Sequence, residues 1–135
     1  MLAHIDRRSL TQFLVGLGLM SAGRASAQAK TVEVVMRPDM RPGAMSMFEP
    51  ETVRIAVGDT VRWKNEAVLI HTATFDPAQA IKAVNVVLPA GVAAFGSADL
   101  LQDDTYSHTF TTAGSYKYVC KYHEEMGMIG TVVVG

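Results

Sequence analysis

The fold is decided by one stretch of the sequence, Gly114-Ser-Tyr-Lys-Tyr-Val-Cys120-Lys-Tyr-His123-Glu-Glu-Met-Gly-Met128-Ile-Gly130-Thr-Val-Val-Val134. Residues 115–119 alternate in character and residues 130–134 are rich in valine, so each half of the stretch predicts a β-strand. The segment between these strands must then form a loop. Such a short loop gathers the thiol of Cys120, the imidazole of His123 and the thioether of Met128 around one point.

A further imidazole can come from His71, which follows the strand expected at Thr60–Lys64. Two imidazoles, one thiolate and a weak thioether suit a copper ion that exchanges single electrons, because sulfur ligands favour Cu(I) and imidazoles suit Cu(II). Cys120 is the single cysteine, so it cannot form an internal disulfide, and a role as metal ligand accounts for it. The sequence therefore predicts one copper site made of His71, Cys120, His123 and Met128.

Strand character also dominates the rest of the chain. The further segments with alternating or β-branched residues are Thr31–Met36, Thr52–Val57, Thr60–Lys64 and Tyr106–Thr111. Gly58-Asp59 separates two of these segments and predicts a tight hairpin. Short strands separated by turns predict an all-β sandwich.

The connection Phe75–Thr105 is long, so we expect it to contain some secondary structure of its own. Pro77–Lys82 is the best helical candidate, with Asp76 as its cap and proline in the first position. Asn85–Leu88 predicts a short edge strand in the same connection. No segment has a sustained apolar period of a long helix.

Residues 1–27 have the pattern of an export signal. Arg7-Arg8 precede the apolar stretch Phe13–Met20, and Ala25-Ser26-Ala27 offers a cleavage site. The arginine pair predicts the twin-arginine route into the periplasm, with a general secretion leader as the alternative. The apolar stretch is shorter than the roughly 20 residues that span a bilayer. We expect a cleaved leader at 1–27, one copper-binding domain at 28–135, and no stable membrane insertion after cleavage.

Composition limits the classes of function. With 135 residues, 49% of them hydrophobic and 19% charged, the chain predicts one globular domain rather than a disordered segment. The formal net charge of −1 gives no basis for nucleic-acid binding. Removal of the leader would take away more basic than acidic residues, so a charged partner is expected to be basic.

The copper loop resembles that of the small blue copper proteins, the cupredoxins. Its Cys-x₂-His-x₄-Met spacing followed by x-Gly is similar to plastocyanin and, more closely, to pseudoazurin, which also has Met-Gly-Met in this loop. Trp63-Lys-Asn65, with His71 six residues on, and the segment 114–118 match the family as well. The resemblance covers Thr31–Val134. It implies an eight-stranded Greek-key β-sandwich with copper near one end and His123 at the surface as the electron port.

Two positions depart from the plastocyanin pattern, which commonly has asparagine at Thr72 and proline at Tyr122. The backbone amide of Thr72 is still able to donate a hydrogen bond to the Cys120 sulfur, which would tune the reduction potential. The axial ligand is expected to be Met128. The shorter His-x₂-Met spacing of amicyanin-like loops would select Met126 instead.

These features predict a monomeric periplasmic electron-transfer protein that is not an enzyme. Its partners would be redox proteins, such as a cytochrome, a reductase or a dehydrogenase, that dock weakly near His123. The alternative is a copper-binding carrier or storage protein. In that case a methionine cluster would bind Cu(I), although filling an irregular core is the more ordinary role of such residues. The cluster consists of Met36, Met40, Met45 and Met47.

Three further predictions concern single side chains. Glu124 and Glu125 flank the proposed electron port, where they either select a basic partner or only solvate the loop. His108 lies on one strand face with aromatic residues and is expected to be a structural, hydrogen-bonded histidine. Trp63 is expected in the core.

Overall fold

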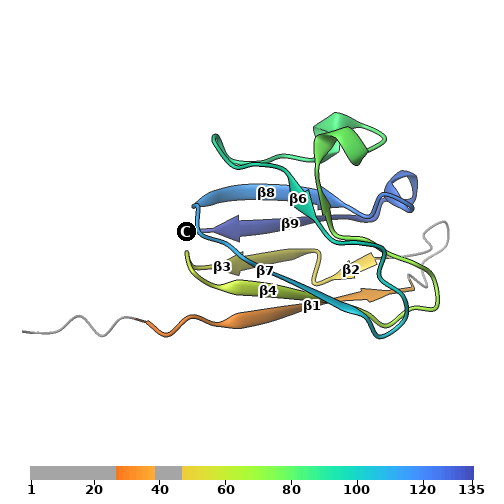
Figure 1. Ribbon diagram of the computed structural model, residues 1–135, viewed down its shortest axis with the longest axis horizontal. Coiled ribbons are helices and arrows are strands. Elements are labelled where there is room, and N and C mark those ends of the chain that lie inside the picture. Colours follow the sequence, from red (N-terminus) through yellow and green to blue (C-terminus); the bar gives the residue numbers. More distant parts are fainter. Residues whose placement is uncertain (1–26, 39–46) are drawn as a thin grey trace, which may run out of the picture.

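The computed structural model describes residues 27–38 and 47–135, whose secondary structure consists mainly of short strands (Figure 1). The strands are β1 Thr31–Arg37, β2 Met47–Glu49, β3 Thr52–Ile55, β4 Thr60–Asn65, β5 Thr74–Phe75, β6 Phe95–Gly96, β7 Thr105–Thr109, β8 Gly114–Val119 and β9 Ile129–Val134. One sheet has the order β2-β1-β4-β7 and the other the order β3-β9-β8-β5-β6. The pairs β1–β4 and β3–β9 are parallel, and the other neighbouring strands are antiparallel.

The predicted all-β sandwich is confirmed, although the described residues form nine strands rather than eight. The number eight came from the family resemblance, and two of the nine strands, β5 and β6, contain only two residues each. The helical elements are the 3₁₀ turns η1 Pro77–Gln79, η2 Ala83–Asn85 and η3 Glu124–Met126. Among residues 27–38 and 47–135, no helix is long and apolar enough to cross a membrane.

Element η1 confirms the helical segment expected in the long connection. Asp76 is its N-cap, and the Asp76 carboxylate accepts a hydrogen bond from the Ala78 amide at 2.9 Å. The edge strand expected at Asn85–Leu88 is wrong. Asn85 belongs to η2, and in that segment only Val87 makes a single β-bridge, to Lys117. A second 3₁₀ turn therefore begins the segment of the expected strand, and the edge strands of this sheet are β3 and β6.

The predicted hairpin at Gly58-Asp59 is also wrong, because this turn joins the two sheets. Strand β3 pairs with β9, whereas β4 pairs with β1 and β7. Gly58 has a φ of +93°, which glycine adopts without strain. The Asp59 carboxylate accepts hydrogen bonds from the Ala56 amide at 2.9 Å and the Lys30 amide at 2.8 Å. A tight turn with several hydrogen bonds can therefore connect strands of two different sheets as readily as the two strands of a hairpin.

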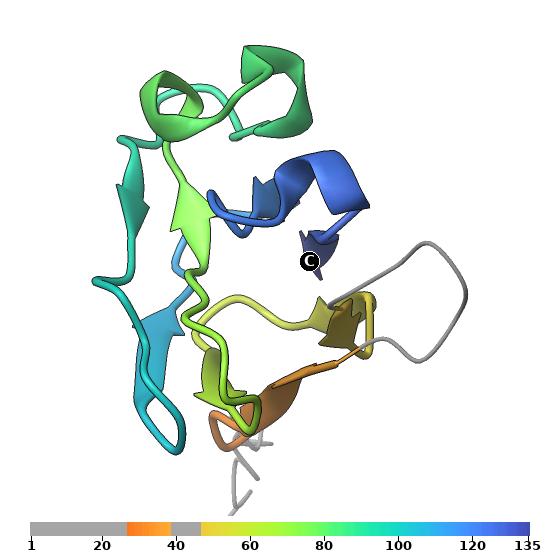
Figure 2. The same cartoon turned by 90° about the vertical axis from the view of Figure 1, so that its right-hand side faces the viewer.

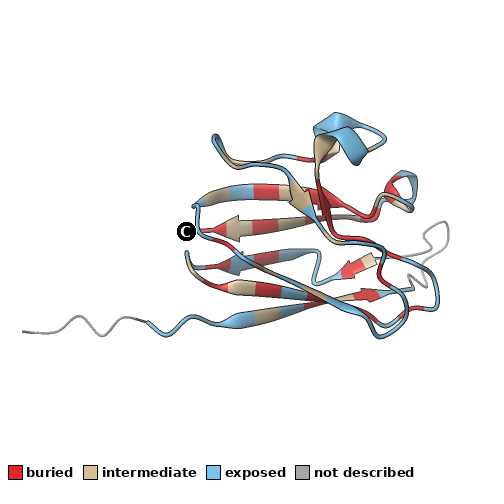
Figure 3. Ribbon diagram, in the orientation of Figure 1, coloured by how far each residue is buried: buried red, intermediate tan, exposed pale blue. Residues whose placement is uncertain are grey.

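Aromatic rings fill the space between the sheets, and the buried residues lie on the inner faces of the strands (Figure 3). The predicted core position of Trp63 is confirmed, since its side chain is fully buried and its Nε1 donates a hydrogen bond to the Tyr118 hydroxyl at 3.0 Å. Gly130 lies against the Tyr118 ring, where an added Cβ would come within 2.5 Å of ring atoms. The other rings beside Trp63 are Phe75, Tyr106 and Phe110.

Three connections come together at one end of the sandwich, opposite to the end at which β9 and the C-terminus lie (Figures 1 and 2). They are the segment 66–73 between β4 and β5, the connection that carries η1 and η2, and the segment 120–128 between β8 and β9, which contains η3. All four predicted metal ligands lie in the first and the last of these connections. The fold therefore brings residues far apart in the sequence to one end of the molecule.

Candidate metal centre

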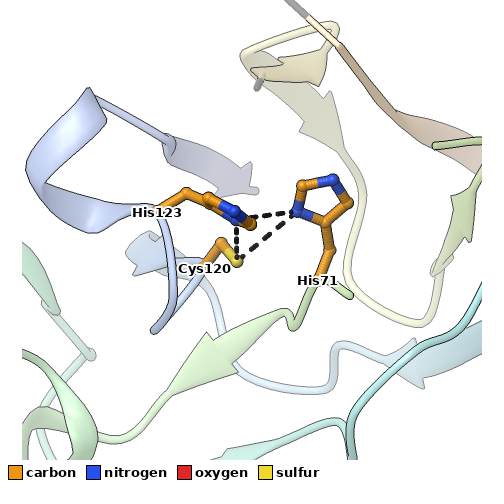
Figure 4. A group of neighbouring side chains, drawn as sticks. All are labelled: His71, Cys120 and His123. Atoms are coloured by element: carbon orange, nitrogen blue, oxygen red, sulfur yellow. Dashed lines mark hydrogen bonds between the residues drawn. The ribbon is translucent and has the colours of Figure 1, made fainter. Parts of the chain in front are cut away.

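Three of the four predicted ligands converge on one point (Figure 4). The Nδ1 atoms of His71 and His123 are 3.1 Å apart. The Cys120 sulfur lies 3.4 Å from Nδ1 of His123 and 3.7 Å from Nδ1 of His71. Cys120 and His71 are fully buried. This group could hold one metal ion.

Each of these side chains is fixed by the backbone around it. His71 forms a β-bridge with Leu100, in which the His71 amide donates at 3.2 Å and the Leu100 amide donates back at 2.9 Å. Cys120 directly follows β8, and its amide donates to the Met128 carbonyl at 3.1 Å. The Met128 amide in turn donates to the His123 carbonyl at 3.2 Å. The segment between β8 and β9 therefore folds back on itself and is held by its own backbone hydrogen bonds.

Burial separates the two methionines that compete for the axial position. The Met128 side chain is fully buried, whereas Met126 is 41% exposed and belongs to η3. The longer of the two spacings therefore selects a buried methionine, and the shorter spacing selects an exposed one.

Thr72 holds the Cys120 sulfur in place and links the connection that contains His71 to the connection that contains Cys120. Its amide donates a hydrogen bond to the Cys120 sulfur at 3.4 Å, which confirms the bond expected from the sequence. Its hydroxyl accepts a hydrogen bond from the Lys121 amide at 3.1 Å and lies 2.8 Å from the Thr74 hydroxyl. The side chain of Thr72 therefore links the histidine connection to the cysteine connection.

Asn65 positions His71 but was not among the predicted site residues. It is fully buried at the end of β4, and its Nδ2 donates to the Leu69 carbonyl at 2.8 Å and the Leu100 carbonyl at 2.9 Å. Its Oδ1 accepts a hydrogen bond from the Ala67 amide at 2.8 Å. These bonds hold the segment that leads into His71. The available signal was a polar residue at the end of an otherwise apolar strand face.

Both imidazoles are neutral at pH 7. Burial and the nearby His123 lower the pKa of His71 to about 4, and burial lowers the pKa of His123. Within the described part of the chain, Nε2 of His71 is buried without a hydrogen-bond partner. Neutral imidazoles and a buried thiol are the groups that bind a transition metal after the thiol loses its proton.

The spacing of the three donor atoms fits one ion. Donors bound to one metal at about 2.0–2.3 Å in a trigonal plane lie about 3.5–4 Å from one another. The observed separations are 3.1, 3.4 and 3.7 Å, so one lies within this range and two lie slightly below it. Two nitrogens, one sulfur and a buried methionine correspond to the donor set of electron-transfer copper sites.

Residues 34–135 match the copper-binding proteins of the plastocyanin/azurin family. The chain belongs to this family. It is 37% identical to chloroplastic plastocyanin of Tetradesmus obliquus over 93% of this chain and 83% of that protein. It is 31% identical to plastocyanin of Prochlorothrix hollandica over 93% of this chain and 88% of that protein. A solved structure of pseudoazurin from Methylobacterium extorquens AM1 is similar with a TM-score of 0.59 and 26% identity, covering 78% of this chain and 75% of that one.

In this plastocyanin/azurin-family protein, His123 borders a shallow apolar depression on the surface. The depression is also lined by Tyr122 and by Val68, Leu69 and Ile70. The hydroxyl of Tyr122 donates to the two carboxylate oxygens of Asp99, at 2.8 and 2.7 Å. This bond stiffens the loop at the position where plastocyanins commonly carry proline. His123 is thus surrounded by apolar side chains, as the family resemblance implies.

The two glutamates after His123 differ in exposure. Glu125 is exposed, but Glu124 is only 4% exposed, so neither a docking role nor loop solvation applies to Glu124. Burial acts to raise the pKa of Glu124. Hydrogen bonds from Asn85 and from the Lys82 and Ile81 amides outweigh burial and hold that pKa below its usual value.

The remaining predicted side chains lie in the core or at its margin. Met36 is fully buried, as expected of a core residue, and Met47 is half-buried, while Met40 and Met45 fall outside the described residues. His108 is half-buried and stacks on Phe95 with ring centroids 3.8 Å apart, and it makes no side-chain hydrogen bond to another described residue. Its structural role is therefore stacking, rather than the hydrogen bonding that we expected.

The copper-free protein is expected to lose stability as the pH falls. The unfolded chain binds a proton at His71 near pH 6.5, but the folded chain does so only near its lowered pKa of about 4. The free energy of unfolding should therefore fall by about 2 kcal/mol from His71 alone between pH 8 and pH 5. Urea unfolding at the two pH values measures this change. His71→Leu should reduce the pH dependence, and an unchanged dependence in that variant would contradict the assignment.

Proposed function

We propose that the protein carries single electrons on one copper ion held by His71, Cys120, His123 and Met128. The observation that supports this proposal most strongly is the convergence of two Nδ1 atoms and one sulfur within 3.7 Å in a member of a copper-binding family. Bound copper would supply a couple between Cu(I) and Cu(II). The site is already assembled by the backbone, so little has to move when an electron arrives or leaves.

The protein's own groups would tune and protect the site. His71 and Cys120 are fully buried, which keeps water away from the thiolate. The amide of Thr72 withdraws charge from the sulfur through its hydrogen bond and so favours the reduced state. His123 lies at the apolar depression and provides the shortest way out of the buried site for an electron.

The partner would dock over the depression formed by Val68, Leu69, Ile70, Tyr122 and His123. Electron-transfer partners bind weakly and over small areas, and an apolar surface with few charges allows rapid release. A cytochrome, a reductase or a dehydrogenase would meet these requirements. In this proposal the protein is a monomeric carrier and does not itself catalyse a reaction.

The proposal includes export to the periplasm. The twin-arginine pattern in residues 1–27 and the small residues before Gln28 support a cleaved leader, followed by the copper domain at 28–135. In such an oxidising compartment a free thiol would be exposed to oxidation, and its use as a metal ligand would protect Cys120, the single cysteine.

An absorption spectrum of the mature protein after addition of Cu(II), followed by reduction with ascorbate, tests this function. We expect an intense band in the red region that disappears on reduction and returns on reoxidation. The result would distinguish an electron carrier from a copper-storage protein. A colourless protein with bound copper and an unoxidised Cys120 would exclude the electron-transfer site and favour storage.

A further inference from the structure

A buried carboxylate lies directly after His123. Glu124 is the first residue of η3 and is 4% exposed, although glutamate is seldom buried unless its charge is compensated. The apolar depression beside His123 plays no part in explaining the position of the Glu124 side chain. The compensation comes from another connection of the fold.

Three donors from the connection of η1 and η2 surround the Glu124 carboxylate. Its Oε2 accepts a hydrogen bond from the Ile81 amide at 2.6 Å. Its Oε1 accepts hydrogen bonds from the Lys82 amide at 3.0 Å and from Nδ2 of Asn85 at 2.9 Å. Hydrogen bonds to an ionised acceptor are stronger than those between neutral groups. Figures 1 and 2 both show the blue η3 segment beside the green η1 and η2 turns.

These bonds brace the histidine end of the segment between β8 and β9. The cysteine end is held by its own β-strand and by Thr72, whereas His123 is held by backbone bonds within the segment and, through Tyr122, by the exposed hydrogen bond to Asp99. Glu124 adds an attachment to a separate part of the fold, one residue from the ligand. Since a metal ligand is oriented by the groups that hold it, this attachment restricts how far His123 can move.

We propose that Glu124 is the positioning residue for His123, and that its hydrogen bonds to the Ile81 and Lys82 amides and Asn85 set the ligand geometry of the copper site. The inference rests on the proposed copper function. Without the bonds, the imidazole of His123 becomes freer to move relative to Cys120. The change in structure between the two oxidation states then grows, and electron exchange slows.

The test compares Glu124→Gln with Glu125→Gln. Both variants remove one negative charge beside His123, but Glu125 is exposed and makes no side-chain hydrogen bond to another described residue. Glutamine at position 124 has the size of glutamate, but an NH₂ group replaces one of the two carboxylate oxygens. This NH₂ group faces an N–H donor and cannot accept its hydrogen bond. In copper-free protein, hydrogen exchange of the Ile81 and Lys82 amides should become at least about tenfold faster in Glu124→Gln and stay unchanged in Glu125→Gln.

The copper-loaded variants report on the site itself. Glu124→Gln should change the ratio of the two main visible bands and the electron paramagnetic resonance spectrum, and it should slow electron self-exchange several-fold. Asn85→Ala removes one of the three donors and should shift the same spectra in the same direction by a smaller amount. If Glu124→Gln fails to fold, Asn85→Ala serves as the test variant in its place.

The outcomes separate this inference from the proposed function. A wild-type protein that never develops the red-region band refutes both. A blue wild type, together with spectra and self-exchange rates in Glu124→Gln and Asn85→Ala that equal those of Glu125→Gln, overturns only the positioning role. Faster amide exchange with unchanged spectra also overturns it, because Glu124 would then stabilise the fold without affecting His123.

Discussion

Cys120→Ser should abolish the intense red-region absorption of the copper-loaded protein while leaving the fold intact. The band requires a thiolate bound to copper, and Cys120 is the single cysteine of the chain. A serine hydroxyl is a harder donor and keeps its proton at neutral pH. It is also similar in size and can still accept the hydrogen bond from the Thr72 amide. Visible absorption after addition of Cu(II), with circular dichroism to monitor the fold, measures the effect.

The matched control is Met126→Leu, which changes another sulfur of the same segment. Met126 is 41% exposed and belongs to η3, so this variant should remain blue. A Cys120→Ser protein that keeps the band would refute the thiolate assignment. A Met126→Leu protein that loses the band would show that any change in this segment disturbs the site, so the loss in Cys120→Ser could no longer be assigned to the thiolate.

Trp63→Ala should lower the free energy of unfolding by at least about 3–5 kcal/mol, which is the usual loss for a buried tryptophan. Trp63 is fully buried, and its ring centroid is 5.5 Å from that of Tyr118 and 5.6 Å from that of Phe75. The Tyr118 hydroxyl also loses its hydrogen-bond donor. Since domains of this size are stable by about 5–15 kcal/mol, the variant should be close to unfolding. Urea unfolding of the copper-free protein measures the loss.

A double-mutant cycle separates the hydrogen bond from the packing. Trp63→Phe leaves the Tyr118 hydroxyl without its donor, and Tyr118→Phe leaves the Trp63 N–H without its acceptor. The double variant removes both partners and should be destabilised by less than the sum of the two single losses. Strictly additive losses would show that the hydrogen bond contributes nothing to stability.

The sequence predicted the features that depend on neighbouring residues. Cys120 and His123 are brought together by a short loop between two strands with clear patterns, so their spacing alone predicted their meeting. Asp76 and the proline after it predicted η1 for the same reason. His71 was predicted from its place after a strand and from the need for a further strong ligand, with the family resemblance in support, because it reaches the site only through the tertiary fold.

The features that were not predicted depend on contacts between distant segments. The turn at Gly58-Asp59 has the local signals of a hairpin, and only the pairing of β3 with β9 determines that it crosses between sheets. Glu124 looked like an exposed charge because its donors lie around Ile81, in a different connection. The role of Asn65 was missed for the same reason, because the carbonyls that accept its hydrogen bonds belong to two separate segments. No period or spacing within one segment contains that information.

The position of β9 also bears on how the protein is made. Strand β9 lies inside its sheet, between β3 and β8, although it is the last of the nine strands in the described residues to be synthesised. A nascent chain that has reached only β8 therefore exposes two unpaired strand edges and a core that lacks Val132 and Val134. Cys120, His123 and Met128 leave the ribosome just before β9 does. Assembly of the sheet and of the metal site should therefore be a single late event, and a chain stalled before β9 should be a ready target for proteases and chaperones.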